Sequence, residues 1–105
     1  MSNSKLASVT LISPNKNSPR NKPIDRISIH CFVGQVTAKR GCEVFQPTSK
    51  KASCNYVVGY DGSIGLCVDE GDRSWCTSSP ANDHRAVTIE TASDNKDPYA
   101  VTDKA

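Results

Sequence analysis

The chain has 105 residues, a formal net charge of +2 and 36% hydrophobic residues. This length suits one small domain with a modest core. The weak, scattered positive charge does not favour nucleic acid as a partner, and no apolar run approaches the roughly 18 residues of a membrane-spanning helix. The first residues contain no apolar signal-peptide segment, so we expect synthesis in the cytoplasm.

The first strong strand pattern covers residues 26–34, where apolar and polar residues alternate before a glycine. A short β-type run at residues 9–12 and a loop rich in proline, asparagine and serine precede it. The alternation predicts a half-buried strand that places His30 near its end. An imidazole there suits a metal, although the residue alone is also typical of a structural histidine. Cys31 should face the opposite side of the strand and pack there.

Residues 37–45 predict a helix. Thr37 is suited to cap its N-terminus, and Cys42 and Phe45 fall on one apolar face with Ala38. The Gln-Pro pair that follows should end the helix, because proline cannot continue it.

The next elements are a hairpin and a further strand. Residues 55–60 and 63–68 flank an Asp-Gly pair, which is a strong hairpin turn signal. Residues 69–85 form a polar segment with the only tryptophan, Trp75, and a loop of this length is uncommon unless it has a function. Residues 86–92 alternate again and predict another strand.

The five cysteines do not follow the pattern of a disulfide framework or a zinc knuckle. Their number is odd, the gaps between them are long and no CxxC pair occurs. Most are therefore expected to be buried thiols that act as small apolar side chains. They are Cys31, Cys42, Cys54, Cys67 and Cys76.

Strands and helices in this mixed order predict an α/β fold, with a mixed central β-sheet flanked by helices. Thr102 and the acidic residue after it are typical of the first turn of a last helix. A single turn is not stable alone, so we expect the chain to be the N-terminal part of a longer domain.

Four motifs in order resemble the zinc-dependent N-acetylmuramoyl-L-alanine amidases. They are I-S-I-H at residues 27–30, the aromatic strand with its Asp-Gly turn at 55–62, R-S-W at 73–75 and V-T-I-E at 87–90. These amidases share the fold of peptidoglycan recognition proteins and occur as phage endolysins and bacterial autolysins. The resemblance covers residues 9–105.

The resemblance implies a peptidoglycan hydrolase that cuts the amide between N-acetylmuramic acid and L-alanine with a zinc-activated water. His30 would be a zinc ligand, and Glu90 would act as the catalytic base on that water. Trp75, Arg73 and Asn55 would contact the substrate, and relatives often have histidine where Asn55 stands. Bacterial peptidoglycan would be the partner of a monomeric enzyme that acts on the cell wall after release.

The resemblance also implies that the remaining zinc ligands lie beyond this chain. We therefore expect residues 1–105 to be one partial catalytic domain that is inactive by itself. Two alternatives remain open, a non-catalytic peptidoglycan-binding module and an inactive fragment. Single residues have alternatives too: Glu90 as a solvent-facing strand residue and Trp75 as part of the core. His84 is expected to be exposed in the polar loop, and Cys76 is a less favoured ligand candidate.

Overall fold

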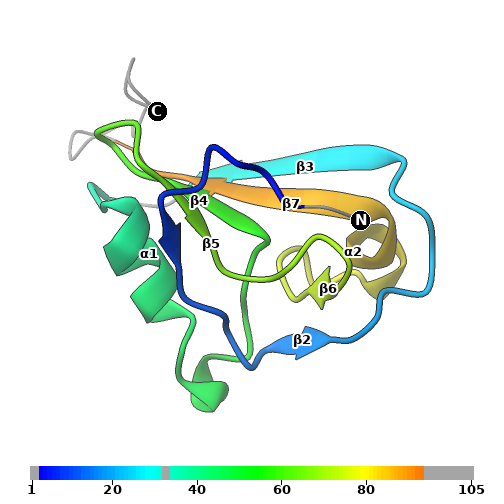
Figure 1. Ribbon diagram of the computed structural model, residues 1–105. Helices are drawn as coiled ribbons and strands as arrows, with labels where there is room; N and C mark the ends of the chain where they lie inside the picture. The colour runs from blue at the N-terminus through cyan, green and yellow to red at the C-terminus, as the bar shows by residue number, and fades with distance from the viewer. Residues whose placement is uncertain (1–2, 32–33, 94–105) are drawn as a thin grey trace.

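Five strands form a mixed sheet in the computed structural model, which describes residues 3–31 and 34–93 (Figure 1). β4 and β5 are antiparallel, and the other neighbouring pairs are parallel. This arrangement confirms the predicted α/β fold with a mixed central sheet. From edge to edge the strands are β1 Val9–Thr10, β5 Ile64–Leu66, β4 Tyr56–Val58, β7 Ala86–Thr91 and β3 Arg26–Cys31.

The predicted hairpin and first helix are present. β4 and β5 pair around the Asp-Gly turn, where Gly62 has a φ of 86°, a conformation that costs glycine little. Helix α1 spans Ala38–Val44, and the Thr37 side chain caps it by accepting a bond of 3.2 Å from the Arg40 backbone N–H. A short 3₁₀ helix, η1, follows at Thr48–Lys50.

The segment over residues 69–85, expected to be a loop, contains two short elements. β6, Arg73–Ser74, pairs with β2, Lys16–Asn17, in a second, two-stranded sheet. Helix α2 spans Pro80–Arg85, with Ser79 as its cap and proline in its first turn. Because these elements have two to six residues, their sequence periodicity is too short to detect. The predicted helix start at Thr102 lies outside the described residues.

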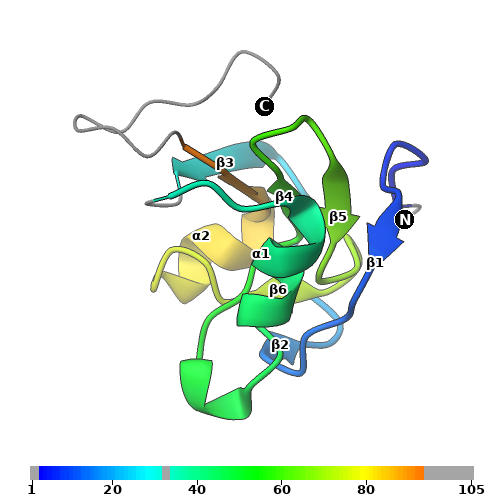
Figure 2. The same cartoon turned by 90° about the vertical axis from the view of Figure 1, so that its left-hand side faces the viewer.

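Both helices pack on the same face of the sheet. The register aligns His30, Glu90, Val57 and Gly65 in one row across four strands, so their side-chain positions share a face. α1 lies against this face at Gly65, and α2 lies beside β7 on the same side (Figure 1 and Figure 2). The two helices thus form one layer on this face, with α1 over β1, β5 and β4 and α2 beside β7.

The opposite face of the sheet is more open among the described residues. On β3, Ile27 is 67% exposed and Ile29 is 71% exposed.

No helix in the part of the chain that the structure describes is long and apolar enough to cross a membrane.

The core between α1 and the sheet contains three of the cysteines. Cys42, Cys54 and Cys67 are fully buried and cluster with Phe45 and Val57. Their thiols fill space as small apolar groups, as predicted. Cys31 is different, because it is exposed rather than packed. Cys31 lies at the end of the edge strand β3, on the open face that it shares with Ile27 and Ile29.

Gly65 lets α1 approach the sheet closely. A Cβ at this position would lie 2.7 Å from the Cys42 sulfur and 3.4 Å from the Ala38 Cβ. We expect Gly65→Ala to lower the free energy of unfolding by about 1–3 kcal/mol through overpacking, measured by urea denaturation. Gly71→Ala is the matched control, because a Cβ there meets nothing within 4 Å. Equal stability of the two variants would contradict this packing.

Candidate metal centre

His30 and Glu90 lie directly opposite each other on the parallel strands β3 and β7. Paired residues of neighbouring strands point to the same face, and the His30 Nδ1 lies 3.8 Å from the Glu90 Oε1. The His30 side chain keeps 40% of its surface exposed, whereas Glu90 keeps 14%. The structure thus brings together the two residues that the sequence singles out, with the imidazole accessible from solvent.

Cys76 joins this pair from a third segment, between β6 and α2. Its Sγ donates a hydrogen bond to the Glu90 Oε1 at 3.7 Å. One donor atom from each of His30, Cys76 and Glu90 lies within 4.8 Å of the other two, and all three residues are half-buried. Nitrogen, sulfur and carboxylate oxygen at this separation can hold a divalent metal ion. From the sequence Cys76 is only a less favoured ligand candidate, because no spacing pattern connects it to His30.

Burial dominates the electrostatics of this cluster. It raises the pKa of the Glu90 carboxyl, and the nearby His30 imidazole and Cys76 thiol oppose that rise. Burial also raises the pKa of the Cys76 thiol to about 12, with further contributions from the carboxylates of Glu90 and Asp83. Without a metal, Cys76 therefore keeps its proton near neutral pH and shares it with Glu90.

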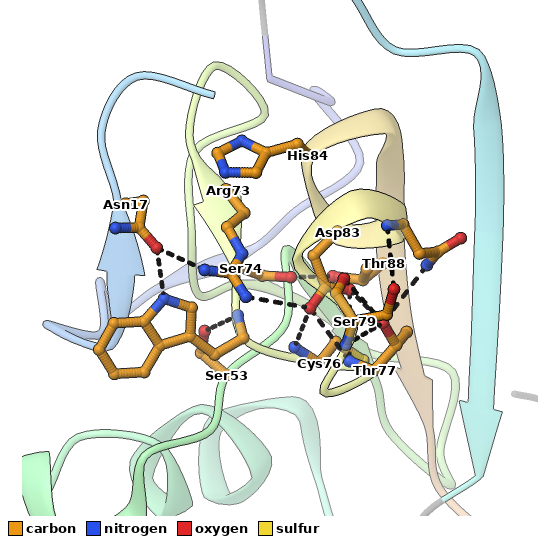
Figure 3. A network of polar contacts seen from close by, with 12 residues as sticks. Asn17, Ser53, Arg73, Ser74, Cys76, Thr77, Ser79, Asp83, His84 and Thr88 are labelled. Carbon is orange, nitrogen blue, oxygen red and sulfur yellow. Dashed lines mark hydrogen bonds and ion pairs between the residues drawn. The ribbon is translucent and has the colours of Figure 1, made fainter. Parts of the chain in front are cut away.

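The carboxylate of Asp83 holds the backbone that carries Cys76 (Figure 3). Asp83 is fully buried on α2. It accepts bonds of 3.2 Å from the backbone N–H groups of Cys76 and Thr77 and one of 2.7 Å from the Thr77 hydroxyl. Arg73 Nη2 lies 3.8 Å away and balances its charge. The turn at Cys76 is therefore fixed by groups other than its own side chain.

Asn55 is enclosed in the protein. It has no exposed surface, and its amide donates to the backbone oxygens of Val68 and Asp69 at 3.1 Å each. Its Oδ1 accepts a bond of 3.0 Å from the Thr88 N–H. The bond to Thr88 ties the start of β4 to β7, and Thr88 stands two residues before Glu90. The structure therefore gives Asn55 a positioning role in the sheet and not the substrate contact that the sequence suggests.

Arg73 and Trp75 face the opposite side of their segment from Cys76. The Asn17 Oδ1 accepts bonds from Arg73 Nη1 at 2.7 Å and from the Trp75 indole at 2.8 Å (Figure 3). Both side chains line a cavity of about 500 Å³ together with Lys51. In contrast, the intervening Ser74 bonds the Thr88 hydroxyl at 2.6 Å. The structure thus places Arg73 and Trp75 at a cavity, on a different side from His30 and Glu90.

The sequence predicted that His84 is an exposed loop residue, and this prediction is wrong. It lies in α2 and is half-buried. Its Nδ1 accepts a bond of 3.0 Å from the Asn21 backbone N–H. Burial, followed by the charges of Arg73 and Arg20, lowers its pKa. His84 therefore connects α2 to the N-terminal segment.

Sequence comparison identifies the family of the chain. A model of the N-acetylmuramoyl-L-alanine amidases, Amidase_2, matches residues 20–105. The chain belongs to this family. The match includes β3 and β7 and therefore the His30–Glu90 pair. No curated protein sequence matches the chain at a significant level.

Two solved structures resemble the amidase chain in fold. A mutant structure of PlyL superposes with a TM-score of 0.63 and 14% identity, over 80% of this chain and 57% of PlyL. A selenomethionine derivative of AmpD gives a TM-score of 0.68 and 15% identity, over 96% of this chain and 68% of AmpD. The chain thus spans less than two thirds of PlyL. At these identities the likeness shows a shared fold.

Asp83 offers a direct test of how the Cys76 turn is held. Asp83→Asn places an amide beside two backbone N–H donors and removes the partner of Arg73. We expect a loss of about 1–3 kcal/mol in the free energy of unfolding, measured by urea denaturation. Asp69→Asn is the control, because the Asp69 carboxylate accepts its bond from Asn3 at the surface. An Asp83 variant as stable as this control would contradict the assigned role.

Proposed function

We propose that the protein hydrolyses the amide between the lactyl group of N-acetylmuramic acid and L-alanine in bacterial peptidoglycan. The observation that supports this most is the facing pair of His30 and Glu90, inside a segment that matches the amidase family. A metal-binding imidazole beside a half-buried carboxylate is what metal-assisted hydrolysis of an amide requires. The proposed place of action is the cell wall.

The donor set fits zinc. Zinc accepts nitrogen, sulfur and oxygen ligands at about 2.0–2.3 Å, so two ligands of a tetrahedral ion lie about 3.3–3.8 Å apart. One possible ligand atom from each of His30, Cys76 and Glu90 lies within 4.8 Å of the other two, close to this spacing. We assign His30 as a ligand of the ion and keep Glu90 as the proton acceptor. When bound, zinc polarises the scissile carbonyl and makes a water molecule more acidic.

Glu90 performs the proton transfers in this proposal. Its carboxylate takes a proton from the attacking water and then delivers it to the departing amine of L-alanine. The backbone of β7 positions it, since the strand is paired on both sides, with β3 at His30 and with β4 at Val57. A base on a central strand is held more rigidly than one on a loop, which supports catalysis by fixed geometry.

The cavity at Arg73 and Trp75 is a proposed contact for the substrate. Lys51 gives it positive charge, Arg73 lines it while paired with Asp83, and the Trp75 indole adds an apolar wall. Such a lining suits a peptide that carries carboxylates, or a sugar ring stacked on the indole. This assignment is independent of the metal centre, because the cavity lies on the other side of the segment.

The chemical identity of the products tests the proposed function. The test uses the protein with any residues that its gene encodes after Ala105. On purified cell walls we expect it to free the amino group of L-alanine without creating new reducing sugar ends. A chelator should abolish this release and zinc should restore it. Release of reducing ends would contradict the proposed bond. Binding to cell walls without release would support a non-catalytic module instead.

Glu90→Gln tests the proposed base. The amide cannot accept the proton of the water, so turnover should fall by about 10²- to 10⁴-fold, while zinc content stays unchanged. Glu43→Gln is the matched control, since Glu43 lies on α1 and pairs with Arg40 at the surface. Full turnover of the Glu90 variant would rule out the role. Loss of zinc together with turnover would instead make Glu90 a ligand.

A further inference from the structure

We propose that Cys76 is a second protein ligand of the metal ion, a thiolate that shares the ion with His30 in front of Glu90. The inference rests on the proposed metal at His30 but not on the bond that the enzyme cuts. It means that residues 30–90 already contain more than one ligand, although the sequence favours only His30.

The surroundings of Cys76 differ from those of the buried cysteines. Cys42, Cys54 and Cys67 are fully buried in the core under α1. Cys76 is only half-buried and packs at the edge of that core. Its sulfur also has polar neighbours, the Glu90 carboxylate at 3.7 Å and the His30 ring within 4.8 Å. A thiol that only filled space would not need an imidazole and a carboxylate as neighbours.

The structure also holds Cys76 in position relative to His30. The buried Asp83 fixes the backbone at Cys76 from α2. From the same helix, Asn82 Nδ2 donates a bond of 3.0 Å to the Ser28 hydroxyl on β3, two residues before His30. One short helix therefore anchors both ligand-bearing segments. Such supporting bonds are typical of metal sites, where they orient the ligands.

The proton balance of this step is simple. A divalent ion binds as the S–H bond of Cys76 breaks and the S–metal bond forms, and one proton leaves. The Glu90 Oε1 already accepts the hydrogen bond of that thiol, so it lies where the proton departs. One nitrogen and one sulfur ligand favour zinc over magnesium or calcium, which prefer oxygen.

Cobalt titration of the 105-residue chain reports directly on a sulfur ligand. Bound through Cys76, cobalt should give a sulfur-to-metal charge-transfer band in the near ultraviolet. Cys76→Ser should lose this band. It should also weaken zinc binding by at least about 10- to 100-fold, because loss of a group that only supports a ligand already lowers metal affinity by that factor. Circular dichroism of the metal-free variant should match the unchanged chain, since the backbone bonds to Asp83 remain.

Two further variants make the test specific. Cys31→Ser removes the exposed cysteine that follows His30, and it should keep the band. Cys76→Asp replaces sulfur by oxygen, and it should keep metal binding but show no band. If Cys76→Ser failed to fold, the Cys76→Asp result would still decide whether sulfur is the ligand.

The outcomes separate this inference from the proposed function. Cobalt that binds through His30 without a charge-transfer band, or a band that persists in Cys76→Ser, would overturn the role of Cys76 and leave His30 as proposed. Absence of metal binding would overturn both ligand assignments. A band that depends on Cys76, in a protein that frees no L-alanine amino groups from cell walls, would support this inference and contradict the proposed function.

Discussion

The parallel pairing of β3 with β7 is the constraint on which the site depends. Its register sets His30 opposite Glu90, and a shift of one residue would turn one of them to the other face of the sheet. Pairing of β7 with β4 extends the same row to Val57, which is buried in the core under α1. The position of the imidazole and the carboxylate is therefore a consequence of core packing and not of loop geometry.

A buried carboxylate provides the second constraint. Asp83 has no exposed surface and bonds the backbone of two successive residues at Cys76 and Thr77. Burying a charge is costly unless it is paired and hydrogen-bonded, and Arg73 with the three donors meets that requirement. These bonds fix the turn between β6 and α2 (Figure 3). That turn places the Cys76 sulfur beside Glu90 and His30.

Local patterns predicted much of this architecture. The alternation around His30, the Asp-Gly hairpin and the Thr37 cap each act over a few neighbouring residues, and all three are present. The short helix α2 had a signal too, Ser79 followed by Pro80, but a six-residue helix has too little periodicity to be recognised. Asn55 and Cys76 could not be placed, because their surroundings come from contacts 13 to 33 residues away in the chain.

A crystal of the protein grown with zinc would test most directly whether a metal ion binds at the end of β3. Anomalous difference density at the zinc absorption edge should peak within bonding distance of a ring nitrogen of His30, on the face shared with Glu90. A peak at His84, or none near either histidine, would contradict the account.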